Sequence, residues 1–115
     1  MQPGKVAAAL RWLGTHSLNE YRLTVPPKDN AYYYFSRLLQ MDPCDDAARQ
    51  GLQQIAARYV ILAEREIADG NQDQARSYTA IGLQVDPENA SLPALSELAV
   101  STKRNFFAGL LRVFK

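Results

Sequence analysis

Residues 45–70 read DDAARQGLQQIAARYVILAEREIADG, and this stretch decides the fold class. Its apolar residues recur at steps of three and four, which places them on one stripe of an α-helix. The residues of that stripe are Ala48, Leu52, Ile55, Ala56, Tyr59, Leu62, Ala63 and Ile67. The two aspartates at its start favour a helix N-terminus, and Gly70 favours a stop. We therefore expect one long helix, with Gly51 as the point where it could bend.

Shorter helices are expected on both sides of the long one. Residues 29–41, DNAYYYFSRLLQM, begin with two good capping residues, and residues 72–85 read QDQARSYTAIGLQV. Each stretch is followed by Asp-Pro, and proline disfavours the helical conformation in the residue before it. Each Asp-Pro pair therefore predicts a helix end.

The two ends of the chain also show helical patterns. We expect a short helix over Lys5–Leu13 and another from Ser17 to about Leu23, because residues 17–20 have the pattern of a capping box. A helix is expected over Ala90–Ser101, and an amphipathic helix over Arg104–Lys115. In the first of these, the residues expected to face inward are Leu92, Leu95, Leu98 and Ala99. No segment alternates with period two, so the predicted fold class is all-α, with a helical domain over residues 1–103 and a basic amphipathic C-terminal helix over residues 104–115.

Two of the helices end alike, because residues 39–43 read LQMDP and residues 83–87 read LQVDP. Residues 56–89 match several positions of a 34-residue helix–turn–helix repeat. The matching residues are Tyr59, Leu62, Ala63, Gly70, Ala75 and Pro87. Ala31, Phe35 and Pro43 repeat the second half of the pattern upstream, whereas Thr79 departs from it and Tyr78 is expected to supply the missing ring. The sequence thus resembles the tetratricopeptide repeat (TPR) family over about residues 15–100.

The resemblance implies antiparallel helical hairpins, with about two repeats followed by the C-terminal amphipathic helix. Pro43 and Pro87 are 44 residues apart, so ten residues exceed the 34-residue period. We expect these ten, about residues 46–55, to elongate the first helix of the second repeat.

A narrower resemblance is to TPR-like segments of proteobacterial multidomain proteins, where such a segment lies beside signalling or cell-envelope domains. It rests on an order of residues that includes Arg22-Leu23-Thr24, Asp29-Asn30-Ala31, Gly51-Leu52, Ile55-Ala56 and Gly82-Leu83. This resemblance implies a bacterial module for protein contacts rather than for chemistry.

Composition excludes several classes of function. With one cysteine (Cys44) and one histidine (His16), the chain has no disulfide pair and no Cys/His zinc site, and we expect no catalytic site, metal or cofactor. The formal net charge is +1, and residues 101–115 carry four basic residues and no acid. Without a dense basic face, nucleic acid is not an expected partner. Without a catalytic constellation, a small-molecule substrate is not expected either. No apolar run reaches the roughly 20 residues of a membrane span. We expect a cytoplasmic location, with a membrane-peripheral or envelope location as the alternative.

By the TPR register, the partner-binding groove is lined by six positions of the long helix. These positions are Ala57, Val60, Ile61, Glu64, Ile67 and Ala68. Such a groove suits a helix or an apolar peptide. The basic and amide residues with which some TPR proteins hold a peptide carboxylate are missing. A terminal helix of the chain itself, or a second copy, is the alternative occupant.

Residues 32–35 read YYYF, and four consecutive aromatic residues point all round a helix. Phe35 belongs to the core face by the repeat register. Tyr33 and Tyr34 are candidate partner contacts, because exposed tyrosines are favoured at interfaces. Packing against neighbouring helices is the alternative.

Residues 104–115 read RNFFAGLLRVFK, with Phe106, Leu110 and Phe114 on one face and Phe107 adjoining it. This segment is either a closing helix over the end of the stack or a helix that docks on a membrane surface or a partner. We therefore expect a non-enzymatic protein–protein interaction or scaffolding module of TPR type, which binds a helix or apolar peptide or forms a homodimer. The alternative is a membrane-associated regulatory or assembly component held by its C-terminal helix.

Overall fold

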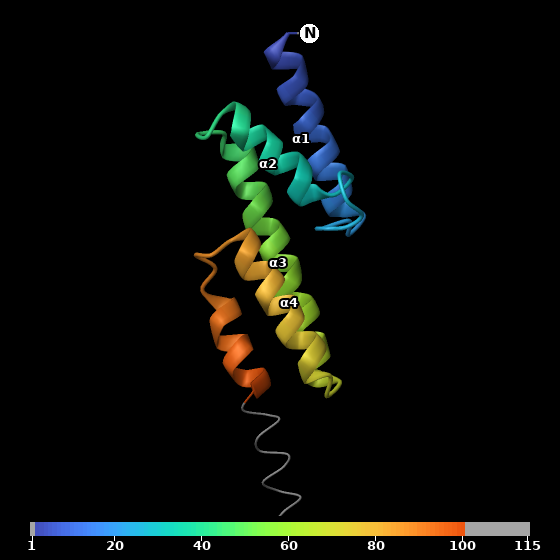
Figure 1. Cartoon of the computed structure of the whole chain (residues 1–115), viewed down its shortest axis with the longest axis vertical. Coiled ribbons are helices and arrows are strands. Elements are labelled where there is room, and N and C mark those ends of the chain that lie inside the picture. Colours follow the sequence, from blue (N-terminus) through green and yellow to red (C-terminus); the bar gives the residue numbers. More distant parts are fainter. Residues whose placement is uncertain (1, 101–115) are drawn as a thin grey trace, which may run out of the picture. The chain divides into compact units, whose positions relative to one another are not determined.

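The computed structural model describes residues 2–100, and the regular elements within this range are α-helices (Figure 1). They are α1 (Pro3–Asn19), α2 (Ala31–Met41), α3 (Asp46–Ala68), α4 (Gln72–Val85) and a further helix, here the fifth helix, described over residues 91–100. The predicted all-α class is confirmed for the described residues. The long helix is also observed, and it continues through Gly51.

The chain divides into two compact units. Unit 1 is Met1–Ile55, with α1, α2 and the first part of α3. Unit 2 is Ala56–Lys115, whose described helices are the rest of α3, α4 and the fifth helix. The boundary between the units therefore falls inside a helix.

The core of unit 1 centres on the ring of Phe35, which is 3% exposed. A Cβ atom added to Gly14 of α1 would lie 2.8 Å from this ring, and one added to Gly51 of α3 would lie 2.5 Å from it. The ring thus fits between two helix backbones that carry no side chain at the contact. Gly51 weakens α3 locally, but the close approach of Phe35 requires it.

The N-terminal segment corrects one sequence prediction. We expected two short helices with a capping box at Ser17, but α1 is one helix that runs through Ser17 to Asn19. Ser17 is fully buried. It lies on the buried stripe of α1, and α1 packs against α2. The members of that stripe are Leu10, Gly14, Ser17 and Leu18. Burial of this stripe outweighs the local capping signal, so the prediction of a second helix start was wrong.

The start of α2 follows the sequence prediction. The Asn30 side-chain oxygen accepts a hydrogen bond of 2.8 Å from the backbone N–H of Tyr33. The Asn30 amide nitrogen donates to the carbonyl of Pro26, also at 2.8 Å. Asn30 therefore caps α2 and fixes the loop before it.

Asp45 caps α3 in a similar way. Its carboxylate accepts hydrogen bonds of 2.9 Å from the backbone N–H of Ala48 and 2.9 Å from the guanidinium of Arg11 on α1. The Ala48 N–H first, and then Arg11, hold the pKa of Asp45 below its ordinary value. This buried carboxylate joins the first helix of unit 1 to the third.

The lowered pKa predicts how stability changes with pH. The ionised form of Asp45 stabilises the fold above the ordinary aspartate pKa of 3.8, and this contribution is lost as the pH falls through the lower pKa of the folded state. Asn at position 45 keeps a capping acceptor but does not titrate. We expect the wild type to be more stable than Asp45→Asn near neutral pH, and this advantage to shrink by about pH 3. Urea unfolding at both pH values measures it, and a difference that stays constant would contradict the assignment.

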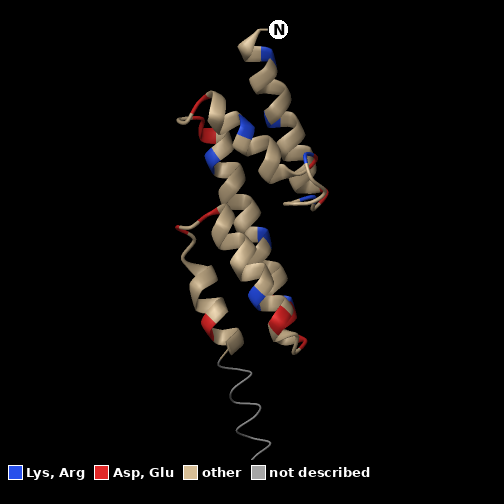
Figure 2. Ribbon diagram, viewed as in Figure 1, with Lys and Arg blue, Asp and Glu red and all other residues tan. Residues whose placement is uncertain are grey.

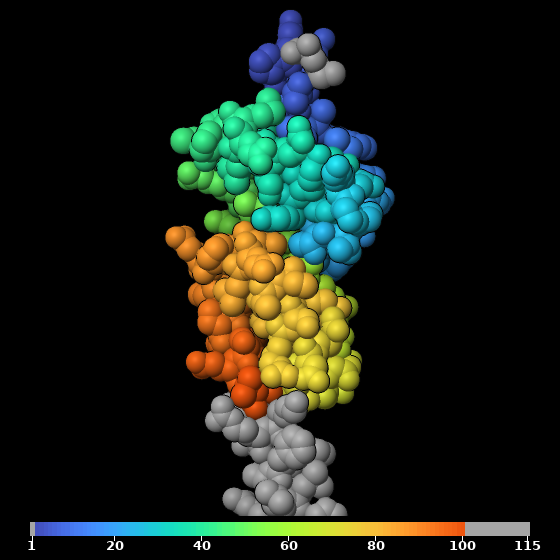
Figure 3. Space-filling model, viewed as in Figure 1, coloured from blue at the N-terminus to red at the C-terminus, as the bar shows by residue number. Residues whose placement is uncertain are grey.

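The core of unit 2 lies between α3, α4 and the fifth helix. Gly70, with φ of 82°, makes the turn between α3 and α4, and Ala75 is fully buried, as expected for the small residue of a helix pair. A Cβ atom on Gly82 of α4 would lie 2.7 Å from Leu92 and 3.1 Å from Tyr59. At this glycine, α4 is therefore in close contact with both other helices. Figures 1 and 3 show α4 beside the fifth helix.

The fifth helix corrects a second prediction. Leu92 and Ala99 are fully buried, and Leu95 is half-buried, but Leu98 is 48% exposed. At about 100° per residue, Leu98 lies roughly 120° round the helix from Leu92. Leu92 and Ala99, seven residues apart, set the inward face, so the prediction that Leu98 faces inward was wrong.

Candidate partner-binding faces

The six predicted groove positions lie along one side of α3 within unit 2, and we call them the α3 stripe. Ala57, Ile61, Glu64 and Ala68 are exposed, and Val60 and Ile67 are half-buried. Ile61 is 37% exposed, a large fraction for an isoleucine. The α3 stripe is thus open in the described part of unit 2.

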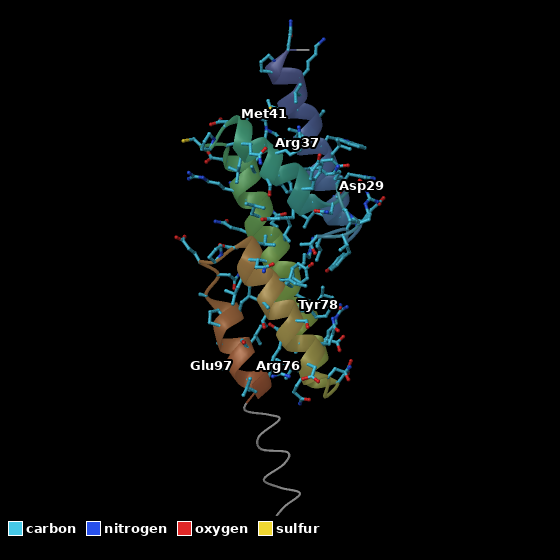
Figure 4. All side chains as sticks on the ribbon, in the orientation of Figure 1. Asp29, Arg37, Met41, Arg76, Tyr78 and Glu97 are labelled. Carbon is cyan, nitrogen blue, oxygen red and sulfur yellow. The ribbon has the colours of Figure 1, made fainter. Side chains whose placement is uncertain are left out.

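The adjoining side of the same stretch of α3 is tightly packed. Ala56 and Ala63 are fully buried, and Tyr59 is nearly so. The ring of Tyr59 lies 5.9 Å, centroid to centroid, from the ring of Tyr78 on α4, which Figure 4 labels. Tyr78 therefore places a ring against α3, as expected. This packing fixes the rotation of α3 and keeps the stripe outward.

Thr79 fills the neighbouring position, where the repeat pattern has phenylalanine. It is 1% exposed, and its hydroxyl donates a hydrogen bond of 2.8 Å to the carbonyl of Arg76. The buried hydroxyl is thus satisfied within its own helix, which makes threonine acceptable in this core.

The α3 stripe lies in an acidic part of the chain. Residues 56–100 contain seven acidic residues and three arginines, a net charge of −4. Figure 2 shows acidic residues near the turn between α3 and α4 and on the fifth helix. Glu64 lies within the stripe itself. An apolar stripe with acidic surroundings is complementary to a partner that is apolar on one side and basic at its edges.

An open hollow of about 550 Å³ lies at the turn between α3 and α4. Its lining residues are Glu66, Gly70, Asn71, Gln72, Asp73 and Gln74. The Asn71 amide donates to Glu66 at 2.8 Å, and Asp73 pairs with Arg76. The hollow is polar, shares no residue with the α3 stripe and does not extend it.

The tyrosines of α2 form a second face, in unit 1. The guanidinium carbon of Arg37 lies 5.6 Å from the ring centroid of Tyr33, and Arg37 donates a hydrogen bond of 3.1 Å to the Tyr33 hydroxyl. The Tyr34 hydroxyl donates to Asp29 at 2.8 Å, and this bond raises the pKa of Tyr34. Both rings are half-buried, whereas Tyr32 is exposed. Figure 4 labels Arg37 on α2 and Asp29 in the loop before it.

The two predicted partner-binding sets thus belong to different compact units. Tyr33 and Tyr34 are held by neighbours in sequence, whereas the apolar members of the α3 stripe have no polar side-chain group that could form such bonds. Sequence reasoning missed the role of Arg37, although its spacing of four residues from Tyr33 is the spacing at which helix side chains meet. It also did not predict that Leu98 is exposed. That exposure depends on which face of the fifth helix packs against α4.

The residues singled out for chemistry lie at the surface of unit 1. The ring of His16 stacks on Trp12 at 4.9 Å, and its Nε2 atom lies 3.1 Å from the Glu20 carboxylate. Trp12 is 63% exposed, and Cys44 is exposed at the corner after α2. Within residues 2–100, no group of three potential ligands that could hold a metal ion is found.

The remaining predicted docking residues, Phe106, Phe107, Leu110 and Phe114, lie outside the described residues. None of the helices in the described range combines the length and apolarity needed to cross a membrane.

Comparison with known proteins finds no family model that matches this chain, and no significant match among curated proteins or solved structures. The candidate faces are therefore judged on their own geometry.

Proposed function

We propose that this chain is a non-enzymatic helical module of TPR type whose α3 stripe binds another protein. One observation carries the proposal: α3 buries one side tightly in unit 2 and leaves an apolar stripe open on another. The helical hairpin of α3 and α4, with its small contact residues and glycine turn, supports the TPR type. An open apolar stripe on a rigid helix suits the apolar face of a partner helix or peptide.

The preferred partner segment is an amphipathic helix with basic edges. Val60, Ile61 and Ile67 offer the apolar contact, and Glu64 offers a carboxylate to a lysine or arginine of the partner. A contact of this kind gains affinity from apolar burial and selectivity from charge.

The α3 stripe can be tested with a matched pair of substitutions. Ala57 and Ala80 are both exposed alanines inside helices of unit 2, but only Ala57 belongs to the stripe. A displayed library of amphipathic helical peptides is selected on the full chain, and the selected peptides are then measured against Ala57→Glu and Ala80→Glu. We expect Ala57→Glu to weaken binding at least about tenfold, because the glutamate would be buried unpaired in the complex. Ala80→Glu should leave binding unchanged.

Circular dichroism of both variants controls for folding. The proposal fails if the selected peptides bind Ala57→Glu as tightly as the wild type, or if selection on the wild type enriches no peptide.

A further inference from the structure

Unit 2 leaves two large apolar side chains exposed in its described part, Ile61 on the α3 stripe and Leu98 on the fifth helix. We propose that residues 103–115 of this same chain bind the α3 stripe, so that an outside partner must displace them. This inference names the first occupant of the proposed binding face and rests on that face being a docking site.

Charge complementarity identifies this occupant. Residues 56–100 have a net charge of −4, whereas residues 101–115 carry Lys103, Arg104, Arg112 and Lys115 and no acid, a net charge of +4. The two parts adjoin in sequence. These opposite charges attract each other, and binding of the segment would bring them together.

The apolar pattern of the segment fits the α3 stripe as well. Phe106, Leu110 and Phe114 follow a spacing of four residues, and basic residues stand at both ends of the segment. The α3 stripe is also mainly apolar, with Val60, Ile61 and Ile67 around a single acid, Glu64. Apolar residues of the segment would cover apolar residues of the stripe, while the basic residues at its ends would be attracted by the acidic residues of unit 2.

Attachment to the same chain strengthens such a contact. A tethered segment has an effective concentration in the millimolar range at a site it can reach. A contact too weak to hold a free peptide of this sequence is then largely formed within one molecule. The same tether lets a tighter outside partner displace the segment.

A disulfide in the full chain tests the proposal. Cys44 is the single cysteine and is exposed, so Cys44→Ser removes the native thiol. In this background, Ile61→Cys is combined with Leu110→Cys, and the control combines Ala80→Cys with Leu110→Cys. Oxidation of dilute protein is followed by non-reducing electrophoresis and peptide mass spectrometry. We expect the Ile61–Leu110 disulfide to form within one chain at least about tenfold faster than the control.

Three outcomes would overturn the inference. These are equal rates for the two pairs, no disulfide in either pair, and a disulfide that forms only between two chains, which would assign the segment to a second copy. Flotation of the full chain with phosphatidylserine-containing vesicles, together with an absent Ile61–Leu110 disulfide, would assign the segment to a lipid surface instead.

The result can be separated from the test of the proposed function. If Ala57→Glu abolishes peptide binding but no intrachain disulfide forms, the docking face stands and this inference falls. If the disulfide forms but peptide binding ignores Ala57→Glu, the segment covers the α3 stripe and the proposed function falls. If both hold, adding a selected peptide should slow the disulfide, and Arg104→Glu with Arg112→Glu should slow it too.

Discussion

Replacing Phe35 with alanine is expected to lower the free energy of unfolding by about 3–5 kcal/mol, measured by urea unfolding of the full chain. The ring is 3% exposed and lies between the backbones of α1 and α3 at Gly14 and Gly51. No neighbouring side chain projects from either glycine to fill the space. Collapse around the missing ring would therefore require whole helices to move, which places the expected loss at the high end of core substitutions.

A second substitution shows whether Gly51 is a glycine because of this ring. With Phe35 present, a Cβ at position 51 would lie 2.5 Å from the ring, so Gly51→Ala should destabilise the protein by about 1–3 kcal/mol through overpacking. In the Phe35→Ala background the space is free, and Gly51→Ala should stabilise α3 by up to about 1 kcal/mol through better helix propensity. The same sign of effect in both backgrounds would show that the ring does not determine residue 51.

Leu92→Ala is expected to cost about 2–5 kcal/mol in the same measurement. Leu92 is fully buried in unit 2, and its side chain contacts the surface of α4 at Gly82. The control is Leu98→Ala, which makes the same substitution six residues later in the same helix. Because Leu98 is 48% exposed, its loss should cost less than about 1 kcal/mol. Equal losses would mean that the fifth helix is rotated from the described position.

The helices could be predicted from the sequence because their signals are local. Apolar periodicity gave α3 and α4, Asn30 gave the start of α2, and the residue before each proline gave a helix end. The predictions for Ser17 and Leu98 were wrong because neither a capping pattern nor an apolar residue type shows which neighbour a helix packs against. Those two outcomes were decided by the contact of α1 with α2 and of the fifth helix with α4.

The candidate site was predicted in part. The repeat register predicted six positions on one side of α3, and that side is open. Such a set can be predicted because, once one position of a helix is assigned to a face, the helical period assigns the others. The sequence did not place the tyrosines of α2 in a separate compact unit, since that division follows from contacts between residues distant in the chain. The interaction of Arg37 with Tyr33 was not predicted, although their spacing of four residues on one helix would have been enough to predict it.

The boundary between the two compact units coincides with the start of the 34-residue sequence match. Residues 46–55, the expected extension of α3, belong to unit 1, and Ala56, the first residue of the 34-residue match, opens unit 2. Residues 46–55 are therefore the part of α3 that serves unit 1 as its third helix. Ile55 and Ala56, on either side of the boundary, are both fully buried. Recombination that exchanges protein modules usually joins them at a loop, but the boundary between these two units lies inside α3. Either unit moved alone would therefore gain or lose part of a helix that both cores require.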